Sequence, residues 1–511
     1  MAPQLSPLAP PLFGLACLLL SRSTIAGLFA GSLLGVALLP HSFWDIPWLW
    51  LSKHAFPSLQ NSWHLSSIAF TLQLAAFAAI LERSGALHSL LARWNSGQAS
   101  REKFQLSIIA IGFICFFDGL ANALMLGRVG SRLADQVRVT REKLAYLVDT
   151  TSSAIACIAF LSTWSVFQLN LINEALKDSS VTTPAYLLFL QSIPANFYCL
   201  LSLVLAILSA RYNWNPPPMS NARPQPILKT GLQTPPISSR PLLSALGPLL
   251  ILLLSVPLAF WLLGRPNAHL LPRSFEDLQL AMATNKGPLA LILAGSIALL
   301  GAIVFFNGPR KLTIPASLNG IRSILPAIIV LLLAWTLNST LTELKTGQLI
   351  AQSLGESLDI RFLPVGVFLA GCFISFSTGS SWGTMTLLMP LALGTALAMG
   401  DSQQLPQNEL QSVILPVIGA VFGGAVFGDH ASPFSDTTIV SSIACQIETT
   451  SHVLTQLPYA LLAGTFAITF GYLPFAFGLP IWLGLLTSTV AVFLVVRTTK
   501  KRFAQTNQST S

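Results

Sequence analysis

The sequence has few charged residues: 9% of its 511 residues are Asp, Glu, Lys or Arg, whereas about 25% is usual in a soluble protein. Hydrophobic residues make up 53% of the chain, and the mean hydropathy is +0.67. This composition excludes an ordinary soluble domain. Apolar stretches of about 18 residues or more recur along the chain, and each is long enough to cross a bilayer as a helix. The sequence therefore predicts an all-α polytopic membrane protein.

Further absences exclude other classes of protein. The six cysteines lie in apolar segments without C-x-x-C spacing, which argues against a disulfide framework and a metal site. The net charge of +9 comes from short loops rather than from one clustered basic surface, so no nucleic-acid partner is expected. The apolar start, MAPQLSPLAPPLFGLACLLL, lacks the positively charged region of a signal peptide and is interpreted as a first span.

The distribution of Lys and Arg predicts the topology, because cytoplasmic loops are enriched in these residues. Basic residues flank the apolar segment 104–127 on both sides, so a re-entrant hairpin there keeps both flanks in the cytoplasm. Acidic residues flank 361–398, which predicts a second hairpin that enters from outside. The charge pattern gives about 11 transmembrane helices plus two re-entrant hairpins, with the N-terminus outside and the basic C-terminus in the cytoplasm.

Weak internal similarity predicts two inverted repeats. FFDGLANALML (116–126) resembles FSTGSSWGTMTLL (376–388), and DTTSSAIAC (149–157) resembles DTTIVSSIAC (436–445). Inverted repeats with broken helices characterise secondary transporters. The predicted organisation is N-terminal spans in 1–60, a first repeat in 61–212 (hairpin 104–127, broken helix 144–170), a proline-rich cytoplasmic linker in 213–240, connecting spans in 241–318, a second repeat in 319–475 (hairpin 361–398, broken helix 411–445), and a last span with a basic tail in 476–511.

Four aspartates lie deep in apolar context: Asp118, Asp149, Asp429 and Asp436. A charged side chain at the centre of a bilayer costs about 2.5–3.5 kcal/mol on insertion scales, so each needs a compensating partner. No Lys or Arg lies within ten residues of Asp429 or Asp436 in the sequence. A mobile cation or a proton is therefore the simplest partner for these carboxylates.

The stretch GDHASPFSDTT (428–438) has the chemistry of a cation site. Gly428 and Pro433 are expected to unwind the helix, which frees backbone carbonyls for coordination. Carboxylates, hydroxyls and carbonyls suit a small hard cation. The predicted ion ligands in this stretch are Asp429, Ser432, Ser435, Asp436, Thr437 and Thr438.

Other interpretations of these residues stay open. Ser435 and Thr150 are also suitable N-caps, so SDTT and DTTSS could each begin the second half of a kinked helix. His430 is a candidate proton carrier because the ordinary pKa of histidine is about 6.5, although a histidine at a helix break is often a hydrogen-bonded structural residue. His452, at the start of SHVLTQLPY, is interpreted as a loop residue.

Small hydroxyl residues and glycines in STGSSWG (377–383) would let the backbone approach an ion closely. We expect this stretch, and DGLAN in the first repeat, to form the tips of the two hairpins. The predicted tip residues are Asp118, Asn122, Ser377, Thr378, Gly379 and Ser380.

Four stretches together resemble a known family: FGDHASPFSDTTIVSS, TQLPYA (455–460), REKLAYLVDTTSS (141–153) and STGSSWGT (377–384). Over roughly residues 60–475 the sequence is similar to the NhaC-type Na⁺/H⁺ antiporters of the ion transporter superfamily. The resemblance implies a sodium/proton exchanger of the bacterial inner membrane that works by alternating access, often within a homodimer. Apart from the transported Na⁺ and H⁺ and the surrounding lipid, it implies no cofactor.

The resemblance also implies which residues hold the ion. It places Na⁺ at Asp149, Asp429 and Asp436, with Thr437 and the two hairpin tips nearby, and Thr150 beside Asp149 joins this set. The chain departs from the family where Gly119 follows Asp118 in place of a second aspartate, and where Ser451 precedes His452 in place of an aspartate. Each departure removes a titratable group, which changes the charge that the site can bind and release.

The sequence leaves three alternatives to sodium/proton exchange. A sodium-coupled carrier of a small carboxylate such as malate or lactate is favoured next, because some relatives couple sodium to organic acids. An intramembrane aspartyl protease, the one enzyme considered, is disfavoured because its G-x-G-D motif would need glycine where Val426 stands. A channel is disfavoured because two opposed hairpins would close a continuous pore.

Overall fold

The computed structural model describes residues 6–21, 23–39, 42–60, 62–84, 100–116, 119–159, 162–176, 179, 181, 183, 185–223, 241–265, 274, 277, 281, 286–306, 308–344 and 360–506. In this part of the chain all regular structure is helical, as the composition predicts. The predicted tip residue Asp118 and most of the proline-rich linker lie outside the described residues.

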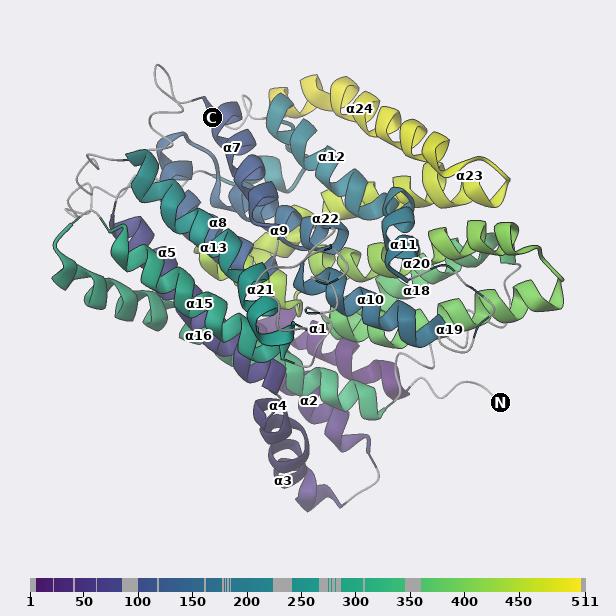
Figure 1. Ribbon diagram of the computed structural model, residues 1–511, viewed down its shortest axis with the longest axis horizontal. Helices are drawn as coiled ribbons and strands as arrows, with labels where there is room; N and C mark the ends of the chain where they lie inside the picture. Colours follow the sequence, from purple (N-terminus) through teal and green to yellow (C-terminus); the bar gives the residue numbers. More distant parts are fainter. Residues whose placement is uncertain are drawn as a thin grey trace.

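The helices pack as one bundle in which α9, α21 and α22 lie in the middle (Figure 1). The N-terminal helices are α1 (Ala9–Ser21), α2 (Thr24–Ala37), α3 (Ile46–Leu49), α4 (Phe56–Gln60) and α5 (Ser62–Arg83). The next group is α7 (Arg101–Ile114), α8 (Gly119–Gln136), α9 (Arg141–Ile158), α10 (Thr163–Leu176), α11 (Ala185–Ser192) and α12 (Phe197–Tyr212). After the linker come α13 (Pro241–Gly264), α15 (Gly287–Val304), α16 (Thr313–Glu343), α18 (Leu363–Thr378) and α19 (Ser381–Ser402). The last helices are α20 (Gln407–Ala431), α21 (Asp436–Ala444), α22 (Thr449–Phe466), α23 (Leu473–Ala476) and α24 (Ile481–Thr506).

Six helices in the described part are long and apolar enough to cross a membrane, among them Leu246–Gly264 and Gln407–Ala431. A seventh is added if the pair Leu187–Ala195 and Phe197–Tyr212, bent by 54°, counts as one span. The protein is therefore a multi-pass membrane protein. The larger count of about 11 crossings stays a prediction, because it rests on the pattern of basic loops.

Both predicted hairpins correspond to pairs of helices. The first pair, α7 and α8, is separated at residues 115–118, and the second, α18 and α19, at Gly379 and Ser380. Gly379 has φ +65°, and a Cβ there would lie 2.5 Å from the backbone carbonyl carbon of Phe434. Glycine is therefore required by both the left-handed backbone and the close approach. How deeply either pair enters the bilayer stays a prediction.

The two predicted broken helices are interrupted at different kinds of position. In the second repeat, α20 ends at Ala431 and α21 begins at Asp436, so the break coincides with Pro433. In the first repeat the interruption falls at residues 159–162, between α9 and α10. The stretch DTTSS (149–153) is thus continuous helix and does not begin a second half, which removes the N-cap interpretation of Thr150.

Small residues let α18 and α20 approach each other closely. An added Cβ at Gly428 would lie 1.8 Å from Ser375 Oγ, and one at Gly424 would lie 3.0 Å from Gly371 Cα. Ser375 Oγ also donates a hydrogen bond of 2.6 Å to the Ala425 carbonyl. Close packing through glycine is a common way for helices to associate in lipid. This contact fixes the end of α20, where Asp429 lies.

We predict that Gly428→Ala lowers the stability of the protein, because the new methyl group forces α18 away from α20. Overpacking of this kind typically costs about 1–3 kcal/mol. Thermal unfolding in detergent measures the effect. The matched control is Gly394→Ala in α19, where an added Cβ meets nothing within 4 Å. Equal unfolding temperatures for the two variants would contradict the packing described above.

Candidate functional site

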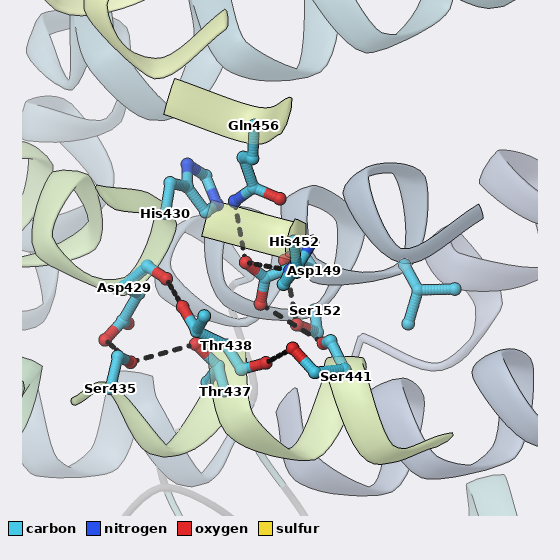
Figure 2. A network of polar contacts seen from close by, with 12 residues as sticks. Asp149, Ser152, Asp429, His430, Ser435, Thr437, Thr438, Ser441, His452 and Gln456 are labelled. Atoms are coloured by element: carbon cyan, nitrogen blue, oxygen red, sulfur yellow. Dashed lines mark hydrogen bonds and ion pairs between the residues drawn. The ribbon is translucent and has the colours of Figure 1, made fainter. Parts of the chain in front are cut away.

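Asp149 lies in the middle of α9 and is fully buried. Its Oδ2 accepts a 2.7 Å hydrogen bond from Gln456 Nε2, and its Oδ1 accepts a 3.2 Å bond from Ser441 Oγ. His452 Nε2 lies 3.4 Å from Oδ2 of the same carboxylate. Figure 2 shows these groups converging on Asp149 from α21 and α22. Neutral donors thus compensate both carboxylate oxygens in the interior.

His452 corrects the interpretation made from the sequence. It is a fully buried residue of the first turns of α22 rather than a loop residue. Neither of its ring nitrogens makes a hydrogen bond with a described residue. The contact with Asp149 Oδ2 becomes an ion pair when the ring is protonated. The ring nitrogen thus lies directly beside the buried carboxylate.

Asp429 lies near the end of α20, four residues before the break, and is also fully buried. Its Oδ1 accepts a 2.8 Å hydrogen bond from Ser435 Oγ on the far side of the break. Its Oδ2 has no hydrogen-bond partner among the described residues. The hydroxyl of Ser381, in the first turn of α19, is a neighbour of this carboxylate and is likewise buried without a partner.

Ser435 could either cap α21 or belong to the site at Asp429, and its contacts decide between these two interpretations. Ser435 occupies the N-cap position of α21, but its side chain makes no capping hydrogen bond. The hydroxyl instead contacts Asp429 Oδ1 and lies 3.2 Å from Thr437 Oγ1. Since the capping function is unused, Ser435 belongs to the polar site at Asp429.

The short helix α21 connects the two buried carboxylates. Thr438 Oγ1 donates to the backbone carbonyl of Asp429, and Ser441 Oγ donates to the Asp149 carboxylate. Residues three apart lie on the same face of a helix, so one face of α21 reaches both aspartates (Figure 2). A movement of α21 would change the surroundings of both.

His430 is held by hydrogen bonds at both ring nitrogens. Nδ1 lies 2.8 Å from the Tyr198 hydroxyl, and Nε2 lies 2.8 Å from Ser153 Oγ. Ser153 follows Asp149 by one helical turn, so His430 ties the end of α20 to α9. These contacts favour the structural interpretation of His430 over that of a proton carrier.

Asp436 and Thr437 lie at the first turn of α21. Asp436 is half-buried, and its Oδ1 accepts a 2.8 Å bond from the backbone N–H of Thr437. This contact is a local helix-start interaction. Asp429 lies within electrostatic range of both Asp436 and Asp149. No group of three or more Asp, Glu, His or Cys side chains suited to a metal ion occurs in the described part. Any Na⁺ there would need hydroxyl and carbonyl ligands as well.

Several other predicted ligands and tip residues form hydrogen bonds with backbone groups rather than with Asp149 or Asp429. Ser432 Oγ donates 2.8 Å to the Phe376 carbonyl and so joins the break to α18. Thr378 bonds the backbone of its own helix, and Ser380 caps α19 through Gly383 N–H. Ser377 and Thr150 are buried.

Asn122, in the first turn of α8, is the described tip residue of the first hairpin. Its amide donates to the carbonyls of Gly112 and Thr151, and its Oδ1 is buried without a partner among the described residues. It therefore holds the start of α8 against the helix that carries Asp149.

Sequence reasoning missed four contributors: Ser441, His452 and Gln456 around Asp149, and Ser381 beside Asp429. One signal could have indicated two of them. His452 and Gln456 are four residues apart in an apolar helix and therefore share one face. Nothing in the sequence says that this face meets Asp149.

The site is thus a pair of buried carboxylates with no Lys or Arg partner among the described residues. Oxygen ligands of this kind bind protons and small hard cations. The sequence family fits this chemistry: the model of the Na⁺/H⁺ antiporter family matches residues 155–476, more than half of the chain. The protein belongs to the Na⁺/H⁺ antiporter family. The resemblance found in the sequence motifs is thereby confirmed, and the protein is a membrane transporter of the antiporter type.

The protein is similar to three curated proteins, two of which have antiporter names. An uncharacterized protein of Haemophilus influenzae is 27% identical over 510 residues, which is 97% of this chain and 95% of that one. An uncharacterized Na⁺/H⁺ antiporter of the same organism is 27% identical over 189 residues, 36% of this chain and 37% of its own. The malate-2H⁺/Na⁺-lactate antiporter of Bacillus subtilis is 32% identical over 130 residues, 23% of this chain and 24% of its own.

We predict that Gln456→Leu destabilises the protein, because the Asp149 carboxylate then loses its shortest hydrogen bond. Leaving a buried acceptor without its donor costs about 1–3 kcal/mol. The control is Gln411→Leu, which removes a half-buried amide bonded to Gln191 and Thr183, away from any buried carboxylate, and should lower the free energy of unfolding less than Gln456→Leu does. Thermal unfolding of both purified variants measures the difference. An unchanged melting temperature in Gln456→Leu would rule out this bond as a support of Asp149.

Proposed function

We propose that the protein exchanges Na⁺ for H⁺ across the bacterial inner membrane, with cation and proton competing for buried carboxylates during alternating access. The observation that carries the proposal is the half-satisfied carboxylate of Asp429, whose Oδ2 lacks a hydrogen-bond partner in the described structure while Ser381 Oγ beside it also lacks one. An ionised carboxylate at this depth needs a positive charge.

In this proposal Na⁺ binds at Asp429. The carboxylate, the hydroxyls of Ser381 and Ser435 and carbonyls at the break supply oxygen ligands, which suit a hard cation. The cation would meet ligands from α19, α20 and the start of α21. A proton on Asp429 removes the charge and with it the affinity for Na⁺.

The Asp149–His452 pair is the proposed second proton site. Gln456 and Ser441 keep the carboxylate in place whether or not His452 is protonated, because they donate to it and need no charge. The face of α21 that contacts both aspartates would transmit the state of one site to the other. Reorientation is favoured only when the carboxylates are neutralised, since moving a bare charge through apolar surroundings is costly.

We predict that Asp429→Asn abolishes exchange, because the amide can neither release a proton nor supply a negative charge. The measurement is proton movement driven by a sodium gradient in proteoliposomes, followed with a pH-sensitive dye. Asp436→Asn should retain measurable exchange, since the Asp436 carboxylate accepts a bond from the N–H at the start of its own helix.

The matched control for both variants is Glu102→Gln, which removes a carboxylate in a solvent-exposed ion pair with Arg211 and should exchange like the wild type. Wild-type rates in Asp429→Asn would exclude Asp429 from the mechanism. Loss of exchange in Asp436→Asn with full exchange in Asp429→Asn would move the cation site to the start of α21.

A second candidate is a sodium-coupled transporter of a small organic anion such as malate or lactate. It is favoured by the match to the malate-2H⁺/Na⁺-lactate antiporter over 130 residues. Uptake of radiolabelled malate or lactate, with and without a sodium gradient, separates the two functions. Sodium-dependent uptake above that of empty liposomes supports the second candidate, and its absence together with sodium-driven proton movement supports the first.

The proposal includes the orientation and assembly expected from the sequence: N-terminus outside, C-terminus in the cytoplasm, and a homodimer in lipid. One feature favours this orientation. The start of α7, the start of α9 and the segment after α12, all expected in the cytoplasm, lie around one cavity. Three segments assigned to one side by charge alone are therefore neighbours in space.

A further inference from the structure

A cavity of about 860 Å³ opens at the ends of three helices, away from the two aspartates. We call it the basic vestibule, and it is lined by Arg101, Arg138, Lys143 and Arg223 together with amide and hydroxyl side chains. None of the described residues that line it is Asp or Glu. Its size lies in the range of small-molecule sites, which is about 300–1,000 Å³.

The arginines of the vestibule are unpaired, whereas their neighbours are not. Arg101, Arg138 and Arg223 are exposed and form no ion pair with a described carboxylate. Nearby, Arg141 pairs with Asp135 at 2.9 Å and Arg211 with Glu102 at 2.6 Å. Carboxylates are thus available at this end of the molecule but are kept out of the cavity.

Lys143 forms the buried part of the vestibule. Its Nζ donates to Ser209 Oγ at 2.9 Å, to the Tyr459 hydroxyl at 3.2 Å and to the Trp214 carbonyl at 3.4 Å, and lies 4.9 Å from the centre of the Tyr146 ring. All these partners are neutral. An ammonium group that is 97% buried without a counter-charge is costly unless an anion can approach it.

Arg138 is held in a backbone conformation that arginine seldom adopts. It follows α8 with φ +54°, a position at which helices usually end in glycine or asparagine. Asn213, also on the vestibule, ends α12 in the same conformation with φ +48°. Gln404 and Gln446 end two other helices in the same conformation, so this backbone geometry places Arg138 at the rim without by itself assigning a function to its guanidinium.

Gln105 adds a requirement that a simple inorganic anion does not meet. It is buried on the vestibule wall, and its Nε2 donates to the Arg101 carbonyl. Its Oε1 is buried without a partner among the described residues. This atom is closed off from the cavity, so a ligand hydroxyl or N–H donor can satisfy it only after the Gln105 side chain turns toward the vestibule.

We propose that the basic vestibule binds a small phosphate ester that also carries a hydroxyl group. A phosphoryl group brings a charge of about −1.5 to −2 and three acceptor oxygens, so one group can meet several guanidinium forks while the charge of Lys143, whose three donors are already bonded, attracts it from the buried side. The hydroxyl meets Gln105 Oε1 once that side chain has turned toward the cavity. The ligand is either a soluble monoester from the cytoplasm or the headgroup of a lipid such as phosphatidylglycerol, a diester that presents one negative charge and two free phosphoryl oxygens beside its hydroxyls. This site is separate from the transport function proposed above.

The test uses the purified full-length protein and glycerol phosphate as the probe, with binding measured by calorimetry. We expect Arg138→Gln to weaken binding by about tenfold, because a charge-assisted contact is lost. Arg138 is exposed, so the variant should fold. The matched control is Lys103→Gln, an exposed cation on α7 that does not line the cavity, which should change the affinity by less than about twofold.

Two further arms identify the source and the chemistry of the ligand. In nanodiscs of phosphatidylglycerol, loss of glycerol phosphate binding relative to phosphatidylcholine nanodiscs indicates a lipid headgroup, and equal binding indicates a soluble ester. Either result supports the proposal if the Arg138→Gln effect holds. It is overturned if glycerol phosphate does not bind in phosphatidylcholine, if malate binds as tightly, or if Arg138→Gln and Lys103→Gln bind alike.

Discussion

The structure depends on one constraint: two carboxylates are buried in a membrane protein without a fixed positive partner among the described residues. Asp149 meets this constraint with the neutral donors Gln456 and Ser441. Asp429 meets it at only one of its two carboxylate oxygens, Oδ1, which accepts a hydrogen bond from Ser435. The difference matters because neutral donors tolerate either protonation state, whereas an open oxygen on a buried carboxylate requires a proton or a cation. The same kind of side chain therefore has a different chemical role in each place.

The helix packing follows from this constraint. Asp429 reaches Ser435 only because the chain leaves its helical path at Pro433, and it reaches α19 only because α18 and α20 approach through glycine. Gly379 in turn lets the chain turn directly against Phe434. Pro433 and these glycines thus let neighbouring segments pack close to the Asp429 carboxylate. Next to Asp429, His430 holds the end of α20 against α9 and α12, because hydrogen bonds at both ring nitrogens fix its ring in place.

The sequence was enough to predict the helices and the position of the second break. Hydropathy locates apolar helices, and Pro433 within the polar stretch GDHASPFSDTT interrupts one. It was also enough to select Asp429 and Ser435, because both lie within one short motif. It was not enough for the partners of Asp149, which come from residues 292 and 307 positions away in the chain. His452 was misinterpreted because a polar residue at the start of a span resembles a loop residue until the packing of α22 on α9 is known.

Helix α9 joins the basic vestibule to the buried acidic site. This helix carries Lys143 in its first turn at the vestibule and Asp149 six residues later, about 9 Å farther along its axis. The neighbouring helix α22 contacts both, with Tyr459 at Lys143 and Gln456 at Asp149. A basic cavity repels cations and attracts anions, so it cannot be the element that concentrates Na⁺ for Asp429. In the proposed exchange, cation selectivity would therefore arise from the buried oxygen ligands themselves, and an anion in the vestibule would act on the same two helices from outside the proposed ion site.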